Sequence, residues 1–170
     1  QLGYETTFDG SERYYYEKAV DGYSEATMLN RNDEDYRFLR GMAYHRMDEY
    51  QKAIDDYDKA IKLDPEYIGA YSWRGDAYYR LNSYQRALDA TTTIIRLDPD
   101  LYKSCNLQGM IYVGKGQTEQ AIQSYSKAIQ LNPEIGVLYL NRAGSYEDLG
   151  QSAKQKADEQ SAYYYNVEYC

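Results

Sequence analysis

Three stretches of the chain repeat one another at a spacing of thirty-four residues, and this period restricts the fold more than any other feature. The stretches are GMAYHRMDEYQKAIDDYDKAIKLDP from Gly41 to Pro65, GDAYYRLNSYQRALDATTTIIRLDP from Gly75 to Pro99, and GMIYVGKGQTEQAIQSYSKAIQLNP from Gly109 to Pro133. Each stretch ends at one of the three prolines of the chain. Self-similarity at a fixed period of this length predicts a stacked array, in which each unit packs only against its neighbours.

The positions that agree between the copies predict a pair of helices in each. The first copy has Gly41 and Tyr44 in its first half, and Ala53 and Leu63 in its second half, and the other two copies keep these residue types. Turns are expected at Met47–Asp48, Asn82–Ser83 and Gly114–Gly116. The second helix must end before the proline, because proline supplies no N–H and pushes the preceding residue out of helical geometry.

This pattern resembles the tetratricopeptide (TPR) repeat, whose motif has a small residue and an aromatic in one helix, spaced alanines in a second, and a closing proline. The resemblance implies an all-α fold, a right-handed superhelical solenoid of antiparallel helix pairs. We expect a partial repeat at residues 1–33 that keeps only its second helix, at about 11–30. Three complete repeats follow at 34–67, 68–101 and 102–135, and a fourth repeat with a divergent capping helix occupies 136–170.

The two ends of the chain depart from the repeat. Residues 1–10 lack apolar periodicity and are expected to be irregular. In the last repeat, Gln155, Lys156 and Glu159 stand where the preceding repeat has apolar residues. A terminal helix with a polar outer face is typical of the cap of a repeat array. The tyrosines at 163–165 are expected to fold onto the last exposed seam.

The middle repeat carries an unusual second helix. Thr91 replaces a tyrosine and Ile94 replaces an alanine. The run Thr91–Ile95 is β-branched throughout, which lowers helix propensity. We therefore expect this helix to open more easily than the others.

Charge and composition restrict the partners. The formal net charge is −8, and no basic run exceeds two residues, so a nucleic acid or an anionic membrane is not the expected partner. No apolar stretch approaches the roughly 20 residues that span a bilayer. Cys105 and Cys170 are far apart and give no disulfide framework, which favours the cytoplasm. The alternative is a processed secreted or periplasmic form, because the chain begins at Gln1 instead of a methionine.

In TPR arrays the first helices line a concave groove that takes peptide segments, and the resemblance carries this groove to matching positions of this chain. Several of these residues are apolar at positions where solvent exposure is otherwise expected, which is typical of interaction sites. The predicted groove residues are Asp35, Phe38, Met42, His45, Ser72, Asp76, Tyr79, Lys103, Asn106, Met110, Leu140 and Asn141. The alternative is a set of scattered exposed apolar residues with no shared role.

One TPR subfamily binds the acidic C-terminus of heat-shock chaperones through a clamp of Lys, Asn and Arg side chains. In this chain Asn141 matches the middle Asn of the clamp, but the flanking cations are absent. A reading that starts from the first complete repeat matches only Lys103. An acidic wall with so few cations repels a carboxylate-rich tail, so no such clamp is expected.

Other conspicuous residues have simpler interpretations. His45 is the only histidine, and we interpret it as a plain surface or groove residue, because metal or triad chemistry needs several convergent groups. Trp73 is either an interaction hot spot or a packing residue between repeats. Cys105 replaces an aromatic on a packing stripe and is expected to be a buried thiol. A solvated face that pairs with nearby lysines is expected at Asp55, Asp56 and Asp58.

These observations favour a non-enzymatic protein-interaction scaffold that binds a peptide segment of a partner in the groove. The alternative is a structural module that assembles end to end into homo-oligomers through its tyrosine-rich termini, at Tyr14–Tyr16 and Tyr163–Tyr165. No phosphate loop, nucleophile elbow or metal-ligand spacing is present in the sequence. We therefore expect no catalytic residue, no cofactor and no bound metal.

Overall fold

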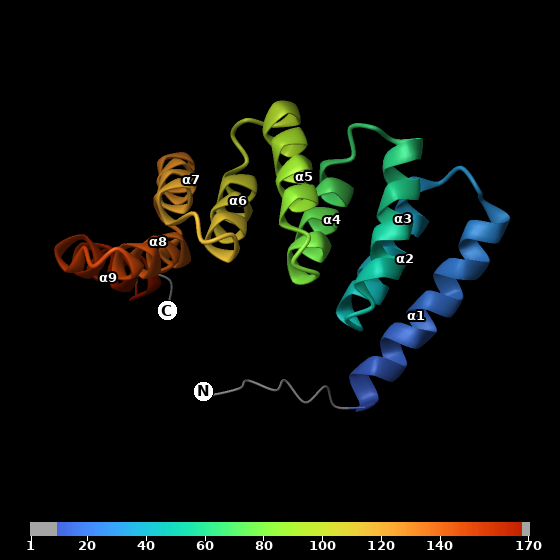
Figure 1. Cartoon of the computed structure of the whole chain (residues 1–170). Coiled ribbons are helices and arrows are strands. Elements are labelled where there is room, and N and C mark those ends of the chain that lie inside the picture. Colours follow the sequence, from blue (N-terminus) through green and yellow to red (C-terminus); the bar gives the residue numbers. More distant parts are fainter. Residues whose placement is uncertain (1–9, 168–170) are drawn as a thin grey trace. The chain divides into compact units, whose positions relative to one another are not determined.

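The computed structural model describes residues 10–167, and within that range every regular element is an α-helix (Figure 1). The chain divides into two compact units, of which the first ends at Ala77 and the second begins at Tyr78, inside the fourth helix. The helices are α1 (Gly10–Leu29), α2 (Glu34–Arg46), α3 (Tyr50–Leu63), α4 (Ile68–Arg80), α5 (Tyr84–Leu97), α6 (Tyr102–Gly114), α7 (Thr118–Leu131), α8 (Gly136–Asp148) and α9 (Ser152–Val167).

In the first unit α2 packs against both α1 and α3 (Figure 1). The core is built from small and aromatic side chains, because Ala53 and Ala60 on α3 let the neighbouring helices approach and Tyr57 fills the space between them. All three side chains are fully buried. Ala70, at the start of α4, completes this cluster.

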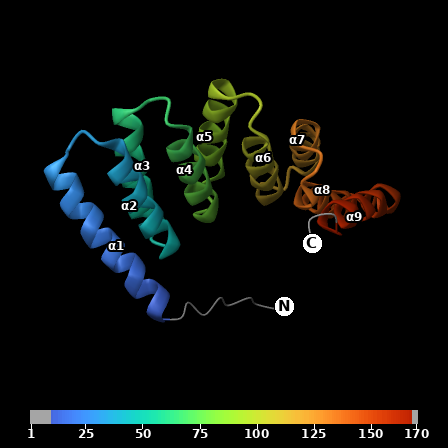
Figure 2. The same cartoon turned by 180° about the vertical axis from the view of Figure 1, so that it is seen from behind.

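In the second unit α6 packs against α5 and α7, and α8 packs against α7 and α9 (Figure 2). The helices α6 and α8, each the first helix of its pair, also touch each other. One core cluster joins Ala128 and Ile129 on α7 to Leu138 and Tyr139 on α8, and a second cluster joins α5 to Ile111 on α6. The helices therefore pair in chain order, as the thirty-four-residue period predicts.

The turn within each helix pair has the same geometry at four places. Asp48, Asn82, Gly116 and Gly150 all have positive φ, between 55° and 71°. At each site the N–H next to this residue bonds back to a carbonyl of the preceding helix, as in the bond from Gln117 N to Tyr112 O. This left-handed cap ends a helix without leaving its last carbonyls bare. It explains why Gly, Asn and Asp alone occupy the position.

Two glycines allow a tyrosine of the second helix to cross the first helix. A Cβ added at Gly41 would lie 2.6 Å from the ring of Tyr57, and one at Gly109 would lie 2.4 Å from the ring of Tyr125. Each glycine precedes its tyrosine by sixteen residues. The helix pair therefore closes because a side chain is missing on one helix and a ring occupies its place.

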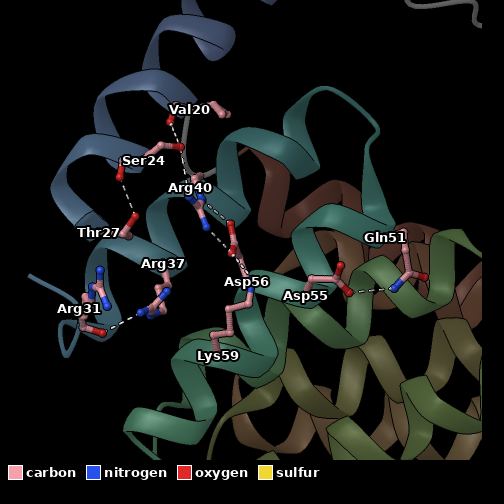
Figure 3. A network of polar contacts seen from close by, with 10 residues as sticks. All are labelled: Val20, Ser24, Thr27, Arg31, Arg37, Arg40, Gln51, Asp55, Asp56 and Lys59. Carbon is pink, nitrogen blue, oxygen red and sulfur yellow. Dashed lines mark hydrogen bonds and ion pairs between the residues drawn. The ribbon is translucent and has the colours of Figure 1, made fainter. Parts of the chain in front are cut away.

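The same spacing of sixteen residues holds a buried ion pair in the first unit. Arg40 on α2 makes two hydrogen bonds to the carboxylate of Asp56 on α3, at 2.6 and 2.7 Å (Figure 3). The Arg40 guanidinium also lies 3.1 Å from the hydroxyl of Ser24 on α1, so it joins three helices. The hydrogen bond to Asp56 raises the pKa of Arg40, although burial opposes the rise. The prediction that Asp56 belongs to a solvated face is wrong, because its side chain is buried.

The arrangement recurs in the second unit one hundred and two residues later, where Arg142 bonds to Asp158 and to Ser126. Asp158 is the one buried charge of the described part of α9. In the repeat that follows Arg40, the residue equivalent to Asp56 is Ala90, and there Arg74 pairs instead with Asp58, which is equivalent to Ser24. When the following helix lacks the carboxylate, the arginine pairs instead with a carboxylate on the preceding helix.

The terminal helices follow the expected pattern where the structure describes them. The helix expected at about 11–30 is α1, while the irregular segment expected at residues 1–10 lies almost wholly outside the described residues. Most of α9 is exposed, and Tyr165 stacks on Tyr139 with ring centroids 5.5 Å apart. Tyr163 and Tyr164 remain exposed. The division into repeats at 34–67, 68–101, 102–135 and 136–170 stays a prediction.

Candidate functional site

A hollow of about 420 Å³ opens on the second unit, beside the C-terminal ends of α6 and α8. Its walls come from α4, α6 and α8, which are the first helices of their pairs, apart from one side chain of α7. The lining residues are Tyr79, Met110, Val113, Tyr125, Leu140, Asn141, Gly144, Ser145, Glu147 and Asp148. Four residues of the predicted groove, Tyr79, Met110, Leu140 and Asn141, are therefore brought together in one place.

Tyr125 reaches the hollow from the second helix of its pair because Gly109 leaves room for the ring. Burial raises the pKa of Tyr125 far above its usual value, and the neighbouring Tyr79 adds to the rise. The hydroxyl therefore stays protonated at neutral pH. The sequence analysis did not place Tyr125 in the groove, although the pairing of a glycine with a tyrosine sixteen residues later was a readable signal.

The polar residues of the predicted groove also meet on α6 and α8. The Nδ2 of Asn141 donates a hydrogen bond of 2.9 Å to Oδ1 of Asn106. The other polar residue of the predicted groove on α6, Lys103, is exposed one turn nearer the start of that helix. The Nδ2 of Asn106 also donates to the sulfur of Met110 at 3.9 Å. The amide pair keeps the Oδ1 of Asn141 and one N–H of each amide for other partners.

The predicted groove residues of the first unit make contacts within that unit. Phe38 and Met42 are half-buried against the core, and the Phe38 ring lies 4.9 Å from the Tyr67 ring. Asp35 is exposed and accepts a hydrogen bond of 2.7 Å from the Tyr67 hydroxyl. The Ser72 hydroxyl donates to the carbonyl of Ile68. These side chains have less to offer a partner than those of the second unit.

His45 was interpreted as a plain surface or groove residue, and the surface alternative is wrong because the side chain is buried. Its Nε2 lies 2.9 Å from a carboxylate oxygen of Asp76, and its ring packs edge-on against Trp73 and Tyr50. The aromatic neighbours exclude water from the imidazole, and the Asp76 carboxylate lies close to its Nε2 without a well-aligned hydrogen bond. Trp73 is a packing residue here, in line with one of its two interpretations.

Comparison of equivalent positions explains why the second unit has a hollow. Asn141, Val113 and Gly144 stand sixty-eight residues after Trp73, His45 and Asp76 respectively. In the first unit His45 on α2 lies against both Trp73 and Asp76 on α4, and the larger side chains occupy the space between these helices. Their smaller counterparts between α6 and α8 leave that space open. The hollow therefore results from side-chain volume at three repeat positions.

The rim of the hollow is acidic. Glu147 and Asp148 lie at the end of α8, and both are exposed. None of the described residues in the lining is a Lys, an Arg or a His, and Val113 and Leu140 present exposed apolar surface beside the two carboxylates. Asp148 is not among the groove residues predicted from the sequence.

Within residues 10–167 no group of His, Cys, Asp or Glu side chains is placed to hold a metal ion. In the same range no helix has the length and hydropathy needed to cross a bilayer. Cys105 is buried, as predicted, and burial raises the pKa of its thiol. A buried neutral thiol is a poor nucleophile. Cys170 lies outside the described residues.

Family comparisons match the repeated part of the chain. A family described as TPR repeat matches residues 47–82, and families described as Tetratricopeptide repeat match residues 68–101 and 102–135. These matches together run without a gap from residue 47 to residue 135. The chain belongs to the tetratricopeptide-repeat family.

Solved structures agree with this assignment. The crystal structure of MamA has a TM-score of 0.83 at 22% identity, over 91% of this chain and 90% of that one. MamA 41-end from Desulfovibrio magneticus RS-1 gives 0.82 at 22% identity, over 90% and 86% of the two chains. A search of curated proteins finds no match. The predicted fold class, an all-α solenoid of antiparallel TPR helix pairs, is confirmed.

Proposed function

We propose that this TPR protein is a non-enzymatic scaffold that holds a peptide segment of a partner protein in the hollow of its second unit. The family and the fold support a role in protein interaction. The observation that carries the finer proposal is the open space between α6 and α8, with Val113 and Leu140 exposed at 41% and 47% beside it. Exposed apolar side chains around a hollow are typical of a binding site.

The chemistry of the walls suits a peptide. Covering an exposed valine or leucine contributes on the order of 1 kcal/mol, so a few apolar contacts supply useful affinity. The amide pair of Asn106 and Asn141 offers a donor and an acceptor to the backbone of a bound segment. Apolar anchors then provide the affinity, and the amides fix the register of the segment.

The hollow can be filled without disturbing the fold. A Cβ added at Gly144 meets nothing within 4 Å, and the same holds for Gly22 on α1. Both glycines lie inside helices, where a larger side chain raises helix propensity. Gly144→Leu therefore blocks the hollow, and Gly22→Leu is a matched control in the other unit.

The test uses random peptides displayed on phage and selected against the full chain. We expect selected peptides to bind the wild type and Gly22→Leu equally, and to lose about tenfold or more in affinity for Gly144→Leu. Thermal melting of the three proteins serves as the folding control. Equal binding to all three proteins would remove the hollow as the binding site.

We propose self-assembly as a second candidate function, because the side chains of Tyr14, Tyr15, Tyr163 and Tyr164 are all more than half exposed. Tyrosine is enriched at protein interfaces. If the termini join copies of the chain, the mass from light scattering should rise with concentration. The double variant Tyr163→Ser/Tyr164→Ser should abolish that rise. A constant monomer mass for the wild type speaks against this function.

A further inference from the structure

We infer that the segment bound in the hollow is basic as well as apolar, with a bulky apolar side chain next to a Lys or an Arg. This inference rests on the proposed function and adds the chemistry of the partner. Two independent features carry it. One is the pair of carboxylates on the rim, and the other is the direction of the helices that end there.

The carboxylates of Glu147 and Asp148 stand beside apolar walls. A lysine or arginine side chain can lay its methylene stem along Leu140 and Val113 while its charge meets the rim. A carboxylate of the partner in the same place is repelled. The arrangement therefore discriminates between segments by charge.

The C-terminal ends of the helices also favour a positively charged ligand. The C-terminal end of an α-helix carries a partial negative charge, and both α6 and α8 end beside the hollow. Neither helix has a basic residue in its last turn, so this charge is not balanced from within the helix.

The nearby cations of the unit are directed elsewhere. Lys115, which follows α6, lines a different hollow together with Asn82 and Tyr84. Arg142 on α8 is bound to Asp158 and Ser126 on the helices that flank α8. Lys103 lies at the other end of α6 and does not line the hollow. None of the described residues that line the hollow therefore supplies a cation in place of one from the partner.

The net charge of the whole chain, −8, also favours a basic partner, because long-range attraction raises the rate of encounter. Attraction between exposed charges weakens with salt, since the screening length falls to about 3 Å at 1 M. Binding of a basic segment should therefore weaken as salt is added, while the apolar contacts persist.

The experiment compares the sequences of the selected peptides and their affinities for charge variants of the full chain. We expect Lys or Arg to be enriched next to a large apolar residue. The double variant Glu147→Gln/Asp148→Asn should bind these peptides about threefold to tenfold more weakly than the wild type does, as expected for two exposed ion pairs. The matched control, Asp100→Asn/Glu119→Gln, removes the same charge from exposed sites outside the hollow and should bind normally.

The outcomes separate this inference from the proposed function. Neutral or acidic peptides that still lose affinity for Gly144→Leu would overturn the basic partner and leave the hollow as the binding site. A failure to select any peptide that depends on Gly144 would overturn both. A synthetic peptide ending in Glu-Glu-Val-Asp serves as the acidic probe, and tight binding of this peptide in the hollow would also overturn the inference.

Discussion

At the scale of single residues, the same missing side chain has two opposite consequences. At Gly109 on α6 there is no room for a side chain, because the ring of Tyr125 occupies that space. Gly144 on α8 is surrounded by open space and contributes to the hollow. The first glycine serves packing, and the second leaves room for a ligand. Both lie in helices, so their backbone preferences are the same.

Replacement of each glycine by alanine should therefore change stability in opposite directions. Gly109→Ala forces a methyl group against the Tyr125 ring and should lower the free energy of unfolding by about 1–3 kcal/mol. Gly144→Ala meets no neighbour and should raise it by about 0.5–1 kcal/mol. Urea denaturation followed by helical circular dichroism measures both values. Destabilisation of equal size at both positions would contradict this account.

Buried tyrosines make the protein sensitive to alkali. Burial raises the pKa of Tyr57 and Tyr125 far above the ordinary value of about 10. The unfolded chain therefore loses these protons first as pH rises, so stability is constant below about pH 9 and falls above about pH 10. A titration of tyrosinate absorbance should show a late-ionising class that appears only as helicity is lost. Ionisation of every tyrosine near pH 10 in a folded chain would contradict this account.

At the scale of elements, α5 and α9 are the exceptions among the described helices. In α5 the hydroxyls of Thr91, Thr92 and Thr93 all donate to backbone carbonyls of the preceding turn. Such bonds compete with the helix ladder and tend to weaken it. In α9 the exposed surface is polar, and the buried carboxylate of Asp158 joins it to Arg142 on α8.

The threonines should make α5 the first helix of the second unit to open. Hydrogen exchange should show weaker protection in α5 than in α7, which has the same length. The substitutions Thr92→Ala and Thr93→Ala should each raise stability by about 0.5 kcal/mol, because alanine has the higher helix propensity and both side chains lie toward the surface. Stronger protection of α5 than of α7 would show that its packing outweighs its propensity.

The ion pair should hold the capping helix in place. Asp158→Ala leaves the largely buried guanidinium of Arg142 without its carboxylate, which typically costs about 3–5 kcal/mol. Glu159→Ala, at an exposed position of the same helix, should cost about 0.5 kcal/mol or less. Urea denaturation of the two variants gives the comparison. Similar losses would mean that Arg142 and Asp158 contribute little to the attachment of α9.

At the scale of the whole molecule, the repeat period was enough to predict the helices and their order. The period predicts the helix ends because prolines and left-handed caps recur at fixed places, as Gly116 and Pro133 illustrate. The period alone could not say how deeply a side chain lies. Asp56 and His45 are buried because a partner from another helix, Arg40 or Asp76, meets them there. Such pairs depend on which residues face each other across two helices.

The candidate site was predictable in part for the same reason. The TPR motif places the groove on the first helix of each repeat, and this was enough to predict Met110, Leu140 and Asn141. The first unit fills the equivalent space with Trp73 and His45. This could not be predicted from the sequence, because it depends on how two helices pack against each other. The sequence therefore predicted where a groove could lie in each repeat, and the structure distinguishes the filled position from the open one.

The central claim is that the hollow between α6 and α8 receives a peptide. Methyl NMR of the full chain during titration with a selected basic and apolar peptide tests it most directly. We predict that the largest shifts belong to Met110, Val113 and Leu140, while Val137, an exposed residue of α8 outside the hollow, keeps its resonances. Large shifts at Met42 or Val137 with none at Leu140 would contradict the claim.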